Sequence, residues 1–349
     1  MKHRPENSTD APAQSGDGEV RAPADAAGAL SPLLVITEPD YMAPPWLRNR
    51  HLQTIWPVVV AGAPRIVFRR ERWTTPDGDF IDLDWATAEA GKGPLVALFH
   101  GLEGSSGSHY ARAMMAQLLA AGWRGVVVHW RGCSGEPNLL ARAYHSGDSA
   151  EVDWILRRLR PDFVAGVSLG ANALLKWLGE QGTQASFIKA AAGVSAPQDL
   201  QAGAIALSRG FNRLYCLNFL TTLKRKSLVK LERFPGIYNR RRLVAARNFF
   251  DFDEVVTAPL HGFDSALDYW TRSSCKQYLG GIRVPTLVLN ARNDPFLPES
   301  VLAKPADVSP QVVLDYPAGG GHVGFVDSRL PGGRDWMPQR LMVFFRQFT

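Results

Sequence analysis

The chain has 349 residues, of which 46% are hydrophobic, so it contains enough apolar surface for one large domain or two ordinary ones. Its formal net charge of +6 implies only that anionic partners are attracted at long range. The three cysteines, Cys133, Cys216 and Cys275, lie far apart and form no C-x-x-C pair. This spacing argues against a disulfide framework and a zinc site, and it favours a reducing compartment.

The first segment, residues 1–31, is rich in Ala, Pro, Gly, Ser and Asp and has no sustained apolar stretch. Such a segment cannot bury enough surface to offset the entropy lost on ordering, so we expect a disordered tail. It lacks the apolar centre of a secretory signal, and no later run approaches the ~18 apolar residues of a membrane span. We therefore expect a cytoplasmic protein without a transmembrane segment.

Residues 65–86 predict a β-hairpin. The stretch reads RIVFRRERWTTPDGDFIDLDWA, in which two strand-like runs flank a turn at Asp77-Gly78. An Asp-Gly pair is a strong hairpin signal because both residues tolerate the positive φ angles of a tight turn. We expect two antiparallel strands here.

Six short apolar runs of strand length follow: PLVALFH (94–100), GVVVHW (125–130), DFVAGVS (162–168), IKAAAGVS (188–195), PTLVLN (285–290) and QVVLDY (311–316). Amphipathic helical patterns accompany them at 110–122, 149–160, 172–182 and 337–348. Apolar strands that alternate with helices predict an α/β fold, with a mostly parallel central sheet and helices on both faces.

The alternation fails in residues 197–275, which are basic and aromatic and contain no strand-like run. We interpret this stretch as a helical lid inserted into one domain, with residues 32–196 and 276–349 as the two parts of the core. Much of the positive charge lies between Lys224 and Arg247. Because few aromatic residues are interleaved with these cations and no nucleic-acid motif is present, a solvated helix face is favoured over an anion-binding surface. Its aromatic residues would suit an acyl pocket or equally a small lid core: Phe211, Tyr215, Phe219, Phe249, Phe250, Tyr269 and Trp270.

Ser168 is the candidate nucleophile. It lies in GVSLG, directly after a predicted strand and before a helical pattern. The turn between them is too sharp for side chains on both flanks, and Gly166 and Gly170 relieve that crowding. The hydroxyl is expected above the C-terminal edge of the sheet, where open α/β sheets bind ligands. A small residue at a tight joint is the structural alternative.

A serine nucleophile needs a base, and the base needs an orienting group. His322 is the expected base, because it follows the last strand and three glycines that let its loop approach the serine. Asp294, just beyond the preceding strand and fixed by Pro295, is expected to orient the imidazole. A helix cap is the structural alternative for Asp294. Asp264 and Asp268 are competing carboxylates in the insertion.

The oxyanion-binding loop is expected after the strand at 94–100, in the glycine-rich stretch HGLEGSSGS. The backbone N–H groups of Leu102 and Leu169 are the predicted donors to the oxyanion, with Gly101 beside them. His100 and Glu103 either shape this loop or are ordinary loop residues.

Several stretches together give the chain a resemblance to a known family: RNRHLQTIWP, HGLEGSSGSHY, RGCSGEPN with YHSGD, GVSLGAN, FDFDEVVTAPLHGFDSALDYW and LNARNDPFLP. The chain resembles the YheT-like α/β hydrolases, a group of bacterial and eukaryotic carboxylesterases. The resemblance implies the α/β-hydrolase fold and a triad of Ser168, Asp294 and His322, in the chain order expected of such enzymes. It also implies esters of short- to medium-chain acids as substrates, while some eukaryotic relatives act on phospholipids or synthesise ethyl esters.

We therefore expect a serine hydrolase that cleaves small-molecule carboxylic esters through an acyl-enzyme on Ser168, without a metal or other cofactor. Transfer of the acyl group to an alcohol is the alternative that uses the same residues. A non-catalytic protein that binds nucleic acid or another anion through the basic run is a weaker alternative, because the sequence has no nucleic-acid motif. Transient contact with a membrane surface is compatible with the expected activity.

The sequence gives weaker support to a cysteine nucleophile, a metal site or an aspartate nucleophile. Cys133 has no partner pattern for a thiol nucleophile. His145 and Asp148 are candidate metal ligands, but two ligands do not make a site. An enzyme with an aspartate nucleophile is disfavoured because the turn carries a serine.

Overall fold

The computed structural model describes residues 40–60, 64–86, 92–327 and 331–349. The tail predicted to be disordered, residues 1–31, lies outside the described residues, as do residues 32–39 of the predicted core. All of the described residues fall within one unit, Ile36–Thr349.

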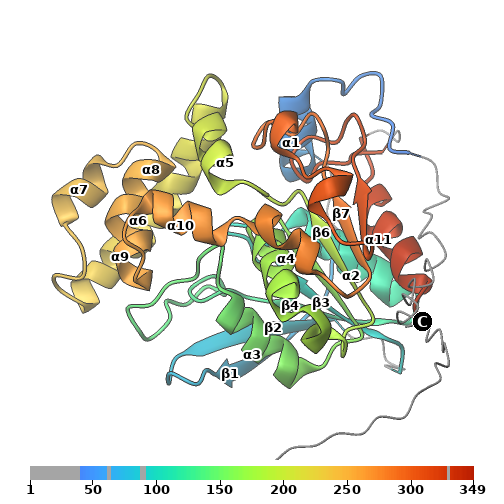
Figure 1. Ribbon diagram of the computed structural model, residues 1–349, viewed down its shortest axis with the longest axis horizontal. Coiled ribbons are helices and arrows are strands. Elements are labelled where there is room, and N and C mark those ends of the chain that lie inside the picture. Colours follow the sequence, from blue (N-terminus) through green and yellow to red (C-terminus); the bar gives the residue numbers. More distant parts are fainter. Residues whose placement is uncertain (1–39, 61–63, 87–91, 328–330) are drawn as a thin grey trace, which may run out of the picture. The chain divides into compact units, whose positions relative to one another are not determined.

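A sheet of eight strands runs through the described part of the chain (Figure 1). The strands are β1 (Arg69–Thr74), β2 (Phe80–Ala86), β3 (Leu95–Phe99), β4 (Arg124–Val128), β5 (Phe163–Val167), β6 (Ala190–Val194), β7 (Thr286–Leu289) and β8 (Val312–Asp315). Their spatial order is β1-β2-β4-β3-β5-β6-β7-β8. The pairs β1–β2 and β2–β4 are antiparallel, and all other neighbours are parallel. The predicted hairpin and the mostly parallel sheet are confirmed.

Burial explains why the strand runs show no alternation of apolar and polar residues. Every residue of β3, β5, β6 and β7 is buried. A strand covered on both faces must be apolar at odd and even positions alike. The edge strand β1 is largely exposed and carries charged side chains instead, which protect an unpaired edge from aggregation.

Helices cover the two faces of the sheet (Figure 1). On one face α2 (His109–Ala120) packs against α11 (Trp336–Arg346), and on the other α3 (Ser149–Leu159) packs against α4 (Leu169–Gln181). The other α-helices are α1 (Arg50–Val59), α5 (Leu200–Leu207), α6 (Asn212–Arg233), α7 (Arg240–Ala245), α8 (Phe249–Phe252), α9 (Ala258–His261) and α10 (Ala266–Ser273). Short 3-10 turns lie at Gly182–Ala185, Cys275–Gly281, Glu299–Val301 and Pro305–Asp307.

The chain between β6 and β7 forms helices, and none of its residues, all of which the structure describes, lies in a strand. We call α5 to α10 the helical segment; it also contains a π-helical turn, Asp253–Thr257. Figure 1 shows it in yellow and orange to one side of the sheet. It has its own apolar cluster, which includes Leu220, Leu243 and Phe252. Within the described residues, no helix combines the length and the apolar character needed to cross a bilayer.

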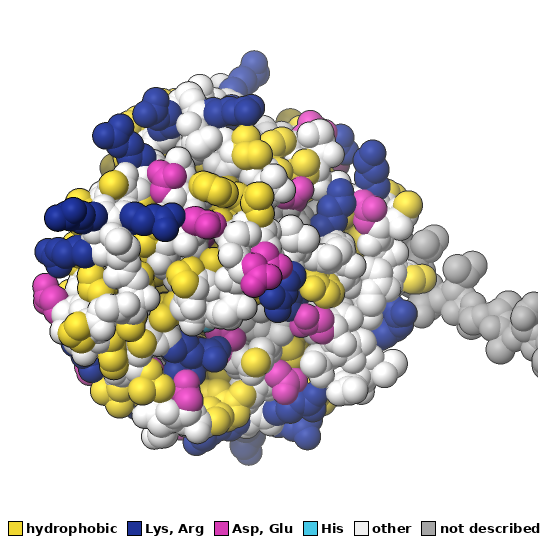
Figure 2. Space-filling view, turned by 60° about the vertical axis from the view of Figure 1, so that its left-hand side comes forward, with side chains coloured by type: hydrophobic (Ala, Val, Ile, Leu, Met, Phe, Trp, Pro, Cys, Tyr) yellow, Lys and Arg dark blue, Asp and Glu magenta, His cyan; other side chains and the backbone are white. Residues whose placement is uncertain are grey.

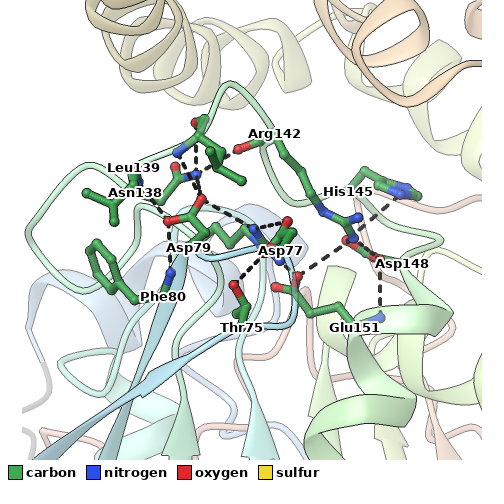
Figure 3. A network of polar contacts seen from close by, with 12 residues as sticks. Thr75, Asp77, Asp79, Phe80, Asn138, Leu139, Arg142, His145, Asp148 and Glu151 are labelled. Atoms are coloured by element: carbon green, nitrogen blue, oxygen red, sulfur yellow. Dashed lines mark hydrogen bonds and ion pairs between the residues drawn. The ribbon is translucent and has the colours of Figure 1, made fainter.

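A buried network of charged groups joins the hairpin turn to the loop after β4 (Figure 3). Arg131 is almost fully buried and bonds Asp77 Oδ2 at 2.8 Å and Glu151 Oε2 at 2.7 Å. Asp79 accepts hydrogen bonds from Asn138 Nδ2 at 2.6 Å and from three backbone N–H groups. Burial raises the pKa of Asp79, but these hydrogen bonds outweigh it and hold the pKa below its ordinary value. The RGCSGEPN stretch is therefore fixed against the hairpin.

Helix α6 docks on the same loop through part of the basic run. Lys230 Nζ donates to Asn138 Oδ1 at 2.7 Å and to two nearby backbone carbonyls at 2.8 and 2.7 Å. One turn earlier Lys226 pairs with Glu103 at 2.8 Å, and one turn later Arg233 bonds the Asn138 carbonyl at 3.0 Å. Lys226 and Lys230 are partly buried against the core while Arg233 stays exposed, so the basic run is not simply a solvated helix face. On this side of the molecule, Figure 2 shows the exposed Lys and Arg side chains interspersed with hydrophobic and acidic ones.

We predict that Arg131→Met lowers the free energy of unfolding by about 3–5 kcal/mol, because it removes the ion pair of the buried Asp79 and leaves Glu151 only the more distant Arg142. Urea denaturation followed by circular dichroism measures the loss. Arg157→Met is the matched control, since Arg157 pairs with Asp153 at the surface, where a pair contributes at most about 1 kcal/mol. A loss in Arg131→Met no larger than in the control would contradict a structural role for the network.

Candidate active site

Ser168 stands at the joint between β5 and α4. The strand ends at Val167 and the helix begins at Leu169, so a single residue makes the turn. Its backbone has φ 53° and ψ −119°, which is strained for a non-glycine residue. The turn is held by two backbone bonds, from the Ser168 N–H to the Val194 carbonyl (2.8 Å) and from the Asn172 N–H to the Ser168 carbonyl (3.0 Å).

Gly166 and Gly170 flank Ser168 because no side chain fits at either position. A Cβ on Gly166 would lie 2.6 Å from the Gly170 carbonyl oxygen, and a Cβ on Gly170 would lie 2.4 Å from the Phe99 carbonyl oxygen. Both contacts are with backbone atoms, which cannot turn aside as a flexible side chain can. Helix α4 therefore approaches β5 and β3 as closely as their backbones allow.

His322 lies between Ser168 and Asp294. Its Nε2 is 3.0 Å from Ser168 Oγ, and its Nδ1 is 2.8 Å from Asp294 Oδ2. When Nδ1 carries the proton and donates to Asp294, the Nε2 lone pair is free to accept the serine proton. The structure thus brings the three predicted residues, from the loops after β5, β7 and β8, into one hydrogen-bonded relay.

Contacts on the far side of the relay fix the carboxylate and the ring. Asp294 Oδ1 accepts the Phe296 N–H at 2.8 Å. The Phe296 ring stacks on the His322 imidazole, with centroids 4.1 Å apart and 27° between the planes. These contacts leave His322 little freedom to rotate away from Ser168. Asp264 and Asp268, the competing carboxylates, form no hydrogen bond with His322 in the described part of the chain.

Two backbone N–H groups beside Ser168 are free to receive an anion. Those of Leu102 and Leu169 have no acceptor among the described residues, and both residues line the same cavity as Ser168. Leu169 begins α4, where the helix dipole favours negative charge. The Gly101 N–H is engaged instead, because it donates to the Tyr110 hydroxyl at 2.9 Å. Gly101 contributes space, since a Cβ there would lie 3.0 Å from Ser168 Cβ.

His100 and Glu103 shape the loop that carries Leu102. His100 is fully buried, and its Nδ1 lies 2.7 Å from the Gly101 carbonyl while its Nε2 accepts the Trp130 N–H at 3.2 Å. Glu103 has φ 56°, and its carboxylate accepts a hydrogen bond from the Tyr144 hydroxyl at 2.8 Å. Both side chains therefore hold strained loop backbone in place.

Backbone strain is concentrated in the loops around Ser168. Of the six described non-glycine residues with positive φ, one ends α3 and the others lie at this edge of the sheet: Glu103, Ser168, Ser195, Val323 and Phe325. Each such conformation costs about 1–3 kcal/mol and persists only where surrounding contacts enforce it. Ser195 Oγ, for example, accepts the Val323 N–H at 3.2 Å and ties the end of β6 to the His322 loop. Such clustering is typical of functional sites.

Thr54 of α1 holds the backbone of His322, a role that the sequence analysis missed. Its Oγ1 accepts the His322 N–H at 3.0 Å and donates to the Arg50 carbonyl at 2.9 Å. The two segments pack so closely that a Cβ on Gly321 would lie 2.8 Å from Thr54 Oγ1. A Cβ on Gly319, Gly320 or Gly321 would have no atom of Ser168 among its nearest neighbours, so these glycines make room for α1 and for Phe325 and not, as expected, for the serine.

Gln53, the neighbour of Thr54, joins the other loop of the relay to the same helix. It is buried, and its Oε1 accepts hydrogen bonds from Asn293 Nδ2 (3.0 Å) and from the Gly320 N–H (2.8 Å). Asn293 immediately precedes Asp294, so one side chain bridges the Asp294 and His322 loops. The signal in the sequence was RNRHLQTIWP, which supported the resemblance but was given no part in the site.

A cavity of about 620 Å³ has Ser168 and His322 in its wall. Of the seven aromatic residues weighed from the sequence, four line it, namely Phe219, Phe249, Tyr269 and Trp270, and the other three are not among its lining residues. Phe252 and Phe296 also line it, although the sequence analysis did not single them out. The lining is mainly apolar and comes largely from the helical segment, which is the composition expected around a hydrocarbon chain.

The other reactive side chains lack the environment for chemistry of their own. Cys133 is buried, and burial raises the pKa of its thiol to about 11, so the nucleophilic thiolate is scarce at neutral pH. His145 Nε2 lies 4.0 Å from Asp148 Oδ2. The described residues contain no group of three or more His, Cys, Asp or Glu side chains placed to hold a metal ion.

Comparison with known proteins identifies relatives over most of the chain. Residues 94–328 match the family model described as alpha/beta hydrolase fold. The protein named "Putative esterase YheT" of Escherichia coli (strain K12) is 38% identical over 84% of this chain and 89% of its own length. Phospholipase ABHD3 of Mus musculus is 30% identical over 90% of this chain and 79% of its own length. The medium-chain fatty acid ethyl ester synthase/esterase 2 of Saccharomyces cerevisiae is 30% identical over 73% of this chain and 62% of its own length.

Solved structures support the fold. An esterase from Exiguobacterium antarcticum superposes with a TM-score of 0.52 and 17% identity, covering 79% of this chain and 98% of that one. An esterase of Pyrococcus furiosus gives a TM-score of 0.51 and 16% identity, covering 83% of this chain and 96% of that one. At this level of identity the likeness concerns the architecture alone.

We predict that Thr54→Val slows the phosphonylation of Ser168 by a fluorophosphonate probe about tenfold, because the His322 backbone loses its acceptor and the imidazole shifts. In-gel fluorescence over time gives the labelling rate. Thr54→Ser, which keeps the hydroxyl, should label at close to the wild-type rate. Thr221→Val is the matched control, since the Thr221 hydroxyl also bonds a carbonyl in its own helix, Leu217 at 2.8 Å, but lies outside the site. Equal rates in wild type and Thr54→Val would refute the positioning role.

We predict that the protein loses stability as the pH falls below about 6.5. Burial lowers the pKa of His100 and of His145 to about 3, whereas an unfolded histidine titrates near 6.5. Between those values the unfolded chain binds more protons, so the free energy of unfolding falls with the pH, by up to about 1.4 kcal/mol per unit for each histidine. Differential scanning fluorimetry from about pH 7 to about pH 4.5 measures the melting temperature. A constant melting temperature down to about pH 5 would contradict neutral, buried histidines.

Proposed function

We propose, on the premise that this chain belongs to the alpha/beta hydrolase family and to its YheT-like members, that it cleaves carboxylic esters through an acyl-enzyme on Ser168. The observation that carries the proposal is the relay of Ser168, His322 and Asp294, joined by contacts of 3.0 and 2.8 Å. The relatives named as esterase and phospholipase support ester hydrolysis as the reaction class.

In the first half of the proposed reaction, His322 Nε2 accepts the Ser168 proton while Oγ attacks the ester carbonyl carbon. Asp294 stabilises the resulting imidazolium through Nδ1. The carbonyl oxygen becomes an oxyanion and receives hydrogen bonds from the N–H groups of Leu102 and Leu169; one such donor typically contributes ~2.7–4 kcal/mol to transition-state stabilisation. His322 then gives its proton to the leaving oxygen, the alcohol departs, and the acyl group stays on Ser168.

In the second half, water releases the acid. His322 takes a proton from the water as its oxygen attacks the acyl carbon, and it returns a proton to Ser168 as the carboxylic acid leaves. An alcohol in place of water would produce a new ester, and the yeast relative whose name joins synthase and esterase makes acyl transfer the second candidate. Ethyl ester among the products formed in the presence of ethanol distinguishes transfer from hydrolysis.

The stretch 197–275 is the proposed lid of the acyl pocket. Its side chains supply much of the apolar lining of the cavity, including Phe252 and Trp270. Lys226 binds Glu103 in the loop after β3, and Lys230 binds Asn138 in the loop after β4; both contacts hold the stretch against the core. An apolar cover excludes water while the serine is acylated, which strengthens the hydrogen bonds to the oxyanion. The proposed substrate is accordingly a small ester with a hydrophobic acyl chain.

Ser168→Ala is expected to reduce turnover of p-nitrophenyl butyrate at least ~1000-fold, because the acyl group then has no oxygen to bond to. Release of p-nitrophenolate, followed by absorbance, gives the rate, and circular dichroism verifies the fold. Ser208→Ala is the matched control, since the Ser208 hydroxyl is exposed and bonds only the Ile205 carbonyl within α5's last turn (2.7 Å). Turnover by Ser168→Ala within tenfold of wild type would rule out the acyl-enzyme.

A further inference from the structure

The cavity beside Ser168 has a line of polar side chains in a wall that is otherwise apolar. Asp253, Thr257 and His261 all line the cavity and follow one another at intervals of four residues, through the π-helical turn and α9. Residues four apart lie on the same face of a helix. We call these three residues the polar stripe. Their neighbours in the same wall are hydrophobic: Phe252, Val256 and Leu260.

Asp253 is a buried carboxyl group without a cation. Its Oδ1 accepts the Thr257 hydroxyl at 2.6 Å and its Oδ2 accepts Trp270 Nε1 at 2.8 Å. No Lys, Arg or His in the described ranges forms an ion pair with it, and burial raises its pKa to about 6. Each carboxyl oxygen keeps a lone pair for one more donor. The position therefore has hydrogen-bonding capacity that the protein does not use.

His261 brings an unused ring nitrogen to the same wall. Its Nε2 is buried and has no hydrogen-bond partner in the described part of the chain. The ring of His145 lies 4.3 Å away between centroids, but its Nδ1 accepts the Gly147 N–H at 3.2 Å and does not serve His261. Burial lowers the pKa of His261 to about 3, so the ring is neutral. A buried polar atom without a partner costs free energy, which a ligand can restore.

A hydrocarbon chain alone does not account for this wall. The same helix supplies Phe252, Val256 and Leu260 to the cavity, so apolar side chains are available to it. An anionic ligand group would be repelled by the Asp253 carboxylate. A cationic group would form an ion pair at Asp253, but at the neutral His261 it would gain only a hydrogen bond. A hydroxyl group suits both positions, because it donates to a carboxylate and either donates to or accepts from a neutral imidazole. The two positions lie about 12 Å apart along a helix, so they are separate contacts.

We propose that the polar stripe binds a hydroxyl group of the substrate, so that hydroxylated esters are preferred over the corresponding plain alkyl esters. This proposal rests on the proposed ester hydrolysis at Ser168 and names the class of ester. The hydroxyl can belong to the acyl chain or to the alcohol moiety. Binding at His261 or Asp253 would then hold the chain in register while its ester group lies at Ser168.

The experiment compares kcat/KM for matched pairs of esters in two arms. The acyl arm uses p-nitrophenyl octanoate and its hydroxyoctanoate analogues, with the hydroxyl moved along the chain. The alcohol arm uses propyl octanoate and glyceryl monooctanoate. His261→Leu should lower the ratio of kcat/KM for hydroxylated over plain ester by roughly fivefold to tenfold in one arm, which identifies the source of the hydroxyl. His261→Gln, which can still form a hydrogen bond, should retain most of the ratio.

Leu260→Ala is the matched control, because Leu260 lines the same wall but offers no hydrogen bond. Leu260→Ala should change kcat/KM by a similar factor for the hydroxylated and the plain ester of each pair. If His261→Leu does not fold, Asp253→Asn tests the polar stripe by replacing a charged acceptor with a neutral one. The ratio of kcat/KM for hydroxylated over plain ester should then fall at least threefold. Ratios that stay at the wild-type value in both arms, or that fall equally in Leu260→Ala, overturn the proposal. Loss of Ser168-dependent turnover of plain octanoate in the wild type would instead overturn the proposed function.

Discussion

The close packing of α4 on the ends of β3 and β5 determines where the reactive groups of this protein lie. At Gly170 the helix backbone reaches the Phe99 carbonyl, and at Gly166 the strand backbone reaches the helix. This approach forces a one-residue turn, so Ser168 adopts a strained φ of 53° and its side chain stands clear of both elements. The same turn leaves the Leu169 N–H at a free helix N-terminus. Any side chain at the two glycines would push α4 outward and separate the hydroxyl from the N–H donor beside it.

The relay depends further on side chains that bind loop backbone rather than substrate. Thr54 accepts the His322 N–H, Ser195 accepts the Val323 N–H and the Tyr110 hydroxyl accepts the Gly101 N–H. Loops at a sheet edge have few backbone partners of their own, and a buried N–H without an acceptor is costly. Each of these hydroxyls therefore satisfies a loop N–H and fixes the loop at the same time. Precise placement of Ser168 and His322 comes from this second set of residues.

Features that depend on neighbouring residues could be predicted from the sequence, and features that depend on distant contacts could not. The strands, the hairpin and the position of Ser168 could be predicted because each depends on residues adjacent in the chain, such as Asp77-Gly78 or Gly166 and Gly170. His322 and Asp294 could be placed by their order after successive strands. The contact of Thr54 with His322 joins residues 268 positions apart, and no local pattern announces it. Likewise, periodicity could not show which aromatics of the helical segment face the cavity, because that depends on how α6 and α8 sit against the core.

The distribution of charge around the cavity bears on what it can bind. The cations of α6 that face the core are already engaged, Lys226 by Glu103 and Lys230 by an amide and two carbonyl oxygens. Arg131 is likewise neutralised within its own network of carboxylates. With His145 and His261 neutral, the Asp253 carboxylate and Arg225 still place charges of opposite sign in the cavity wall, so long-range attraction favours no single sign of ionic ligand. For the proposed ester substrates, selection then comes from shape and from hydrogen bonds. Unpartnered groups such as His261 Nε2 can discriminate most, because a ligand that lacks the matching group leaves the buried nitrogen unsatisfied.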